Sequence, residues 1–166
     1  QALVVKIKTA LAKYDDHDWQ DILNEAHETK KEWENASADL QAKEVSDGLR
    51  DTNPWKPGQI MNHVGAYLDG MAQQLEMMLQ GKSGDYDIFQ QWQGDNIDLE
   101  TLNNTSIQGW SSLINSTVAA SSGAADSTVM MSVEFGELPP KQVIAFVIRH
   151  VNGHILQMRE ARNEER

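Results

Sequence analysis

The sequence predicts an all-α protein whose main helices form a four-helix bundle. In four long segments, apolar residues recur at intervals of three and four, which is the spacing of one face of an α-helix. Glycine, proline and clustered small polar residues punctuate the connections between these segments. We find no internal repeat and no clear sheet pattern, and the short connections favour antiparallel packing of the helices.

The chain has 166 residues, of which 40% are hydrophobic, and this size fits one domain spanning 1–166. Residues 1–17 form an N-terminal extension or a first helix segment. No run of about 18 apolar residues occurs, so we predict no membrane span. The net charge of −11 argues against binding to nucleic acid or to anionic membrane surfaces, and we interpret it as favouring solubility.

The absence of cysteine restricts the chemistry available to the chain. It excludes disulfides, thiolate metal sites and a cysteine nucleophile. Any metal ion would therefore be held by His, Asp, Glu or water. The apolar segment from Ala2 to Leu11 is short and lacks a small-residue cleavage site, so we interpret it as a helix rather than a signal peptide and predict a cytoplasmic location.

The first half of the chain shows two helical segments and a loop. Residues 2–12 carry apolar side chains at helical spacing. Asp15, Asp16 and Asp18 form a polar break, and any of them could cap the second helix, which is predicted from Asp18. The apolar pattern allows this helix to continue as far as Val45. Its apolar positions are Trp19, Ile22, Leu23, Ala26, Trp33, Ala36 and Leu40. Two prolines and a glycine mark residues 51–58 as a loop.

Two more helices are predicted in the middle of the chain. The first runs from Gln59 to Gln80 and ends at Gly81, as helices commonly end at glycine. A connection over 85–96 follows, whose three aromatic residues either anchor it on the core or wall a pocket. The next helix covers 99–120, with Asp98 as a plausible cap. Its stripe consists of Leu102, Ser106, Trp110, Leu113, Ile114 and Thr117.

Residues 124–137 contain β-branched and apolar residues, but a lone strand needs a partner, so we expect an ordered loop. Pro139 and Pro140 then open the last helix, because first-turn N–H groups have no helical partner. This helix runs to about Arg162.

Two histidines of the last helix, His150 and His154, lie four residues apart. On a helix this spacing places both rings on one face, where they can bind one metal ion. The simpler alternative is a pair of core-facing histidines satisfied by hydrogen bonds. His63, early in the helix from Gln59, is the candidate third ligand. A three-histidine site has open coordination positions, which is the catalytic rather than the structural pattern.

Other metal-binding bundles fit the sequence less well. No Glu-x-x-His motif is present, so a carboxylate-bridged di-iron site is excluded. No His-Glu-x-x-His motif is present either, because Val151 follows His150.

Two stretches resemble the DinB-like family, also called the DinB/YfiT group of metal-dependent proteins. The first, Trp-Lys-Pro-Gly-Gln-Ile-Met-Asn-His-Val over 55–64, is similar to that family's entry into its second helix and first ligand histidine. The second combines Gly-Glu-Leu-Pro-Pro-Lys-Gln-Val over 136–143 with the His-x-x-x-His-x-x-Gln pattern over 150–157. The order and spacing of these motifs cover most of the chain from about residue 18.

The resemblance implies an up-up-down-down four-helix bundle with one long crossover. It implies a divalent metal ion on His63, His150 and His154, with nickel or zinc as the leading candidates and iron or manganese as further ones. It also implies a homodimer. Some relatives act with a low-molecular-weight thiol cosubstrate such as bacillithiol or mycothiol.

No general base is identifiable, and Tyr67 and Gln157 are the candidate catalytic residues. Tyr67 could donate a hydrogen bond to a metal-bound group or merely pack in the core. Gln157, three residues after His154, could orient that ligand or face solvent. Asn62 points about 100° away from His63 on a helix and receives little weight. We interpret Trp55 as stapling its loop onto the core, with lining a pocket as the alternative.

The remaining histidines, His17 and His27, are taken as surface residues. The basic residues near the predicted site are Arg149, Arg159 and Arg162. They would suit an anionic thiol or acid substrate, although basic residues in a last turn also complement the helix dipole.

These features predict a metal-dependent enzyme acting on a small electrophilic molecule, as a thiol-dependent S-transferase or a hydrolase. The alternative is a non-catalytic stress-response bundle that binds a metal or a small molecule. A third interpretation is a structural bundle whose histidines only pack.

Overall fold

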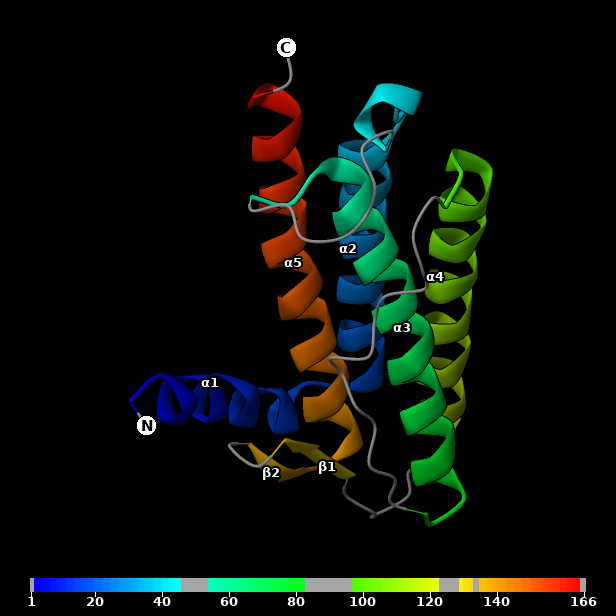
Figure 1. The fold of residues 1–166 in the computed structure, drawn as a ribbon. Helices are drawn as coiled ribbons and strands as arrows, with labels where there is room; N and C mark the ends of the chain where they lie inside the picture. Colours follow the sequence, from blue (N-terminus) through cyan, green and yellow to red (C-terminus); the bar gives the residue numbers. More distant parts are fainter. Residues whose placement is uncertain (1, 46–53, 83–96, 123–128, 133–134, 165–166) are drawn as a thin grey trace.

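In the computed structural model, four long helices lie side by side and a fifth, shorter helix crosses one end of the bundle (Figure 1). The long helices are α2 (Trp19–Ser37), α3 (Pro57–Leu79), α4 (Leu99–Ser122) and α5 (Pro140–Glu164). The crossing helix is α1 (Ala2–Ala12), and short 3-10 turns cover Lys13–Asp16 and Ala42–Glu44. The structure describes residues 2–45, 54–82, 97–122, 129–132 and 135–164. The predicted four-helix bundle is confirmed, whereas the predicted connection over 85–96 lies outside the described residues.

The helix directions differ from the up-up-down-down order. Helices α2 and α5 run in parallel, since Glu32 contacts Arg159 and Ala36 contacts Arg162. Helices α3 and α4 run in parallel in the opposite direction (Figure 1). In chain order the bundle is therefore up-down-down-up, because the long crossover joins α3 to α4.

The predicted helix ends are formed by local hydrogen bonds. The Asp21 N–H donates to the Asp18 carboxylate at 2.8 Å, so Asp18 is the cap among the three candidate aspartates. The Thr101 N–H donates to Asp98 at 2.7 Å, which confirms the predicted cap there. Helix α3 ends at Leu79, and the chain then turns at Gly81, whose φ of 68° is accessible to glycine without strain. The N–H of Lys82 then reaches the carbonyl of Met77, which closes a Schellman motif.

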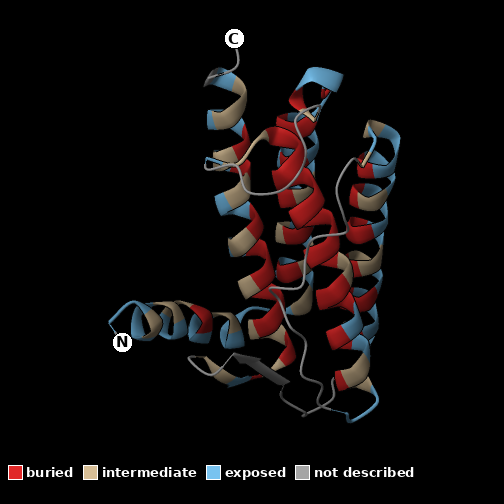
Figure 2. Cartoon of the chain, in the orientation of Figure 1, coloured by how far each residue is buried: buried red, intermediate tan, exposed pale blue. Residues whose placement is uncertain are grey.

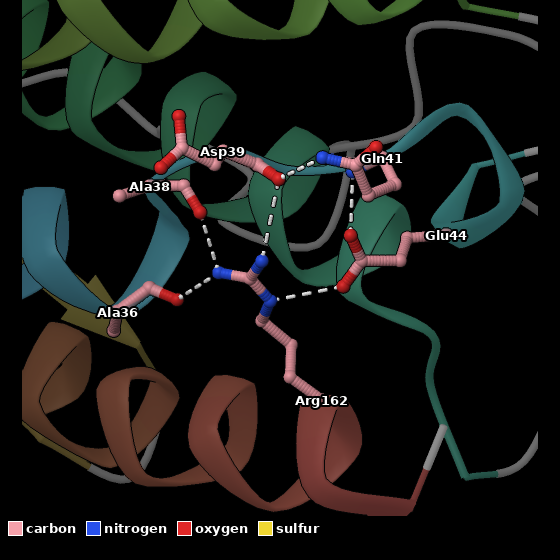
Figure 3. Close-up of polar contacts among 6 residues, drawn as sticks. All are labelled: Ala36, Ala38, Asp39, Gln41, Glu44 and Arg162. Atoms are coloured by element: carbon pink, nitrogen blue, oxygen red, sulfur yellow. Dashed lines mark hydrogen bonds and ion pairs between the residues drawn. The ribbon is translucent and has the colours of Figure 1, made fainter. Parts of the chain in front are cut away.

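Helix α2 ends at Ser37 rather than continuing to Val45. Two residues later Asp39 adopts a left-handed conformation with φ of 55°, which turns the chain out of the helix. The guanidinium of Arg162 in α5 donates to the carbonyls of Ala36 and Ala38 at 2.9 and 2.7 Å (Figure 3). It also pairs with Glu44 at 2.9 Å. A side chain more than 100 positions away thus completes the end of α2.

Residues 124–137 do not form only a loop, because their C-terminal part contributes to a β-hairpin. Strands β1 (Val129–Ser132) and β2 (Gly136–Leu138) pair in antiparallel fashion, with Val129 opposite Leu138. The expectation of an ordered loop was wrong here because the strand finds its partner within a few residues. The hairpin leads directly into α5.

The core lies between the four long helices, and buried residues extend along most of α3 (Figure 2). The largest buried side chains are Trp33, Trp110 and Tyr67. The indole of Trp33 in α2 donates a hydrogen bond to Ser106 in α4 at 2.9 Å. This bond satisfies a buried donor and joins the two helices. No helix in the described part of the chain is long and apolar enough to cross a membrane.

Helices α3 and α4 approach closely where two glycines face each other. A Cβ atom at Gly109 would lie 2.6 Å from the carbonyl oxygen of Gly65 and 3.0 Å from the Cβ of Leu68. Backbone atoms cannot yield as a flexible side chain can. The small residue at this position therefore sets the distance between the helices.

We expect Gly109→Ala to lower the free energy of unfolding by about 1–3 kcal/mol through overpacking, as measured by urea denaturation. The matched control is Gly153→Ala in α5, where an added Cβ meets nothing within 4 Å. That change should raise stability by about 0.5–1 kcal/mol, because alanine loses less backbone entropy in a helix. Equal effects of the two substitutions would contradict the close approach.

Candidate metal site

Three histidines from two helices converge inside the bundle. His63 lies in the second turn of α3, and His150 and His154 lie one helical turn apart in α5. The Nε2 atom of His150 is 3.2 Å from Nε2 of His63 and 3.0 Å from Nε2 of His154. One potential ligand atom from each ring lies within 4.8 Å of the others. The fold therefore brings together the three histidines singled out in the sequence.

The hydrogen bonding of His154 fixes which of its nitrogens faces the other two rings. Its Nδ1 lies 2.8 Å from the side-chain oxygen of Gln157, which can only accept, so Nδ1 carries the proton. Nε2 then presents a lone pair toward His150. Metal-binding histidines commonly have such an outer partner, which orients the ring.

Burial keeps all three imidazoles neutral near pH 7. Burial lowers the pKa of His63 to about 3, and the charges of His154 and His150 add to the effect. Burial also lowers the pKa of His150 to about 4, with a smaller effect of His154. The pKa of His154 is lowered by burial as well, against the opposing hydrogen bond to Gln157. Neutral imidazole is the form that binds metal ions.

The donor set fits a divalent ion. A neutral His150 carries at most one proton on Nε2, so its two contacts to neighbouring nitrogens cannot both be hydrogen bonds. The other contact then places two ring nitrogens close together without a hydrogen bond, an arrangement that a shared cation would relieve. In a tetrahedral site with metal–nitrogen bonds of about 2.0–2.1 Å, ligand nitrogens lie about 3.3 Å apart. The two observed distances are close to this value.

Aromatic side chains surround the histidines. The Trp55 ring is parallel to that of His154, with 6.2 Å between the ring centroids. It meets the His63 ring edge to face, with 5.1 Å between the centroids. The ring centroid of Tyr67 lies 4.3 Å from that of His150, and the Phe146 ring stacks on His150 with 6.2 Å between the centroids. Trp55 therefore lines the site, in addition to joining its loop to the core. The sequence offered no signal for this beyond its position in the loop before α3.

A pocket of about 540 Å³ lies beside the histidine cluster. His150 belongs to both, so the pocket reaches the candidate metal site at this ring. The pocket is lined by Ile7, Phe135, Phe146, Arg149, His150 and Asn152. Ile7 of α1 thus supplies one wall, and Phe135, which precedes β2, supplies another.

The structure separates the three arginines that the sequence places near the site. Arg159 pairs with Glu32 across the surface of α2 and α5. Arg162 completes the end of α2, as described above. Neither of these two lines the pocket beside His150, so the expectation that they suit an anionic substrate stays a prediction. Arg149 alone among the three lines the pocket.

The fold is similar to that of TT2238, a four-helix bundle protein of known crystal structure. The two share 18% sequence identity over 83% of this chain and 95% of that one, with a TM-score of 0.62. Identity this low shows the fold alone. No protein-family model and no curated protein matches the chain in sequence, so the DinB-like resemblance remains a prediction carried by its motifs.

The other residues considered in the sequence fall into two groups. His17 and His27 are exposed and away from the cluster, in agreement with their interpretation as surface residues. Tyr67 and Asn62 are buried, each only 1% exposed. Tyr67 reaches the cluster through its ring. The Nδ2 of Asn62 has no hydrogen-bond partner among the described residues.

Proposed function

We propose that this protein is an enzyme that binds one divalent transition-metal ion through His63, His150 and His154. The observation that carries the proposal is the convergence of three neutral imidazole nitrogens beside a pocket that reaches His150. Nickel and zinc suit an all-imidazole donor set best, and iron and manganese are further candidates.

The donor set supports a catalytic rather than a structural site. Within the described ranges, no fourth His, Cys, Asp or Glu joins the cluster. Structural zinc sites use four protein ligands, whereas catalytic sites keep a position for water or substrate. The pocket beside His150 would give a small molecule access to that position.

A bound divalent ion would supply Lewis acidity, which lowers the pKa of a coordinated water or thiol. The residues of this chain would orient the ligands and exclude water. Gln157 holds the His154 ring, and Tyr67 packs against His150. We propose positioning roles for both residues, and their contacts with His154 and His150 support this. Trp55 and Phe146 cover the ring faces and keep the site partly apolar.

The reaction we propose is thiol-dependent transfer to, or hydrolysis of, a small electrophilic molecule. The support is the DinB-like resemblance together with the open site, and a chain without cysteine would take its thiol from a cosubstrate. Turnover of model electrophiles by the metal-loaded protein, with and without a low-molecular-weight thiol, separates transfer from hydrolysis. The homodimer implied by the same resemblance stays a prediction that light scattering can test.

Elemental analysis of tag-free protein tests the metal proposal directly. We expect about one nickel or zinc ion per chain in the wild-type protein and less than a tenth of that in His63→Ala, because two ligands on one helix turn bind far more weakly than three. His27→Ala is the matched control, since His27 is exposed and lies outside the cluster. Equal metal content in His63→Ala and the wild type would remove His63 from the site.

A further inference from the structure

The pocket beside His150 combines an apolar wall with the positive charge of Arg149. Ile7, Phe135 and Phe146 supply aliphatic and aromatic surface, and the two phenyl rings meet edge to face at 5.1 Å. Arg149 and Asn152 supply the polar groups. No carboxylate is among the described residues of the lining. A volume of about 540 Å³ falls within the range of small-molecule sites, about 300–1,000 Å³.

Arg149 differs from the other arginines of α5 because it has no partner of opposite charge within the described chain. Arg159 pairs with Glu32 and Arg162 pairs with Glu44. The chain carries 25 acidic and 14 basic residues, so carboxylates are in excess. Arg149 nevertheless has no carboxylate partner among the described residues, although it is exposed and lines the pocket.

One carboxylate near Tyr14 already has a hydrogen-bond partner. Tyr14 is close enough for the charge of Arg149 to act on its pKa, and its hydroxyl donates to Glu25 at 2.8 Å. The Glu25 carboxylate therefore has a hydrogen-bond donor of its own. The five N–H groups of the Arg149 guanidinium remain available to a ligand in a geometry that suits two carboxylate oxygens.

We propose that the pocket binds small organic monocarboxylates with an apolar or aromatic body, and that Arg149 is the residue that selects them. The guanidinium would hold the carboxylate at the pocket mouth, while Phe135, Phe146 and Ile7 bury the apolar body. Arg149 and His150 are adjacent in sequence and both line the pocket, so a ligand held in this way lies next to the candidate metal site. This inference deepens the proposed function and rests on it for the role of the ligand as substrate.

The test compares three probes of nearly equal shape: 4-phenylbutanoate, 4-phenylbutanamide and 4-phenylbutylamine. Their binding to the metal-loaded protein is measured by titration calorimetry, and metal content is determined on the same samples. We expect the acid to bind at least about tenfold more tightly than the amide, because hydrogen bonds to charged groups are roughly twice as strong as neutral ones. The amine should bind most weakly.

Three variants assign that preference to a residue. In Arg149→Gln the acid-to-amide ratio should fall to near one while the amide affinity stays unchanged, and in Arg149→Glu the amine should become the preferred probe. Arg159→Gln, the control on the same helix outside this pocket, should keep the wild-type order. Equal binding of acid and amide to the wild-type protein, or no saturable binding of the acid at millimolar concentration, overturns the inference. Survival of the acid preference in Arg149→Gln overturns it as well.

The His63→Ala variant separates this inference from the metal proposal. His63 does not line the pocket, so the preference that depends on Arg149 should persist there even when the metal is lost. If the wild-type protein takes up no metal but still selects the acid through Arg149, the proposed function is refuted and the carboxylate site is retained. An acid preference that disappears with the metal, and not with Arg149, would show direct binding to the ion and refute the role of Arg149.

Discussion

Replacing Arg162 by methionine should lower the free energy of unfolding by about 3 kcal/mol, the scale expected when one partner of a buried ion pair is removed. The side chain of Glu44 is 5% exposed and would keep a carboxylate without its guanidinium. The carbonyls of Ala36 and Ala38 at the end of α2 would lose their donor at the same time (Figure 3). Urea denaturation followed by circular dichroism measures the change.

A second arginine of the same helix provides the control for this prediction. Arg159 pairs with Glu32 on the surface, where the two side chains are 46% and 54% exposed. Exposed pairs contribute about 0–1 kcal/mol, so Arg159→Met should have little effect. In the double variant Arg162→Met with Glu44→Gln, part of the lost stability should return, because the buried charge is gone. Similar losses in the free energy of unfolding for Arg162→Met and Arg159→Met would show that the contacts of Arg162 stabilise the protein no more than an exposed ion pair does.

The contrast between the arginines shows what sequence periodicity can and cannot reveal. A histidine pair four residues apart is a local pattern, and helix geometry alone brings the two rings together. The contact between Arg162 and Glu44 spans 118 positions and depends on how α2 and α5 align. Charge and helix position alone left Arg162 indistinguishable from Arg149, although one closes a helix and the other lines a pocket.

The same limit explains the other differences. Asp18, Asp98 and Gly81 mark helix ends by local chemistry, and each acts as predicted. The end of α2 at Ser37 carries no such signal, because the chain turns at Asp39 rather than at a glycine. The carbonyls of Ala36 and Ala38 accept their hydrogen bonds from Arg162 on another helix. Trp55 could be assigned to the loop before α3 from its prolines, but its stacking on His154 depends on tertiary structure.

The histidine cluster could be proposed before the structure because its parts lie on well-defined helices. What the sequence could not supply is the alignment of α3 with α5 that brings His63 within 3.2 Å of His150. The pocket could not be predicted from the sequence either, because its walls come from α1, the hairpin region and α5. Site residues on one helix are readable from spacing, whereas the surfaces between elements are not.

Adding zinc or nickel to the metal-free protein should raise its thermal stability, and chelation should reverse the change. A ligand that binds only the folded state stabilises it by about 2.7 kcal/mol at a free concentration 100 times the dissociation constant. For a domain of this size, that energy corresponds to roughly 5–10 °C in Tm. Thermal melts followed by circular dichroism, at stepwise metal concentrations, measure the shift.

Variants at the cluster decide whether this shift arises there. In His150→Ala the metal-dependent rise should vanish, because the Nε2 atom of His150 contacts Nε2 of both other rings. Gln157→Ala should keep the rise but need about 10–100 times more metal, since the glutamine only orients His154. His27→Ala should match the wild type. A rise that persists in His150→Ala would mean that the ion binds elsewhere, and the three imidazoles would then be a packed polar cluster within the bundle.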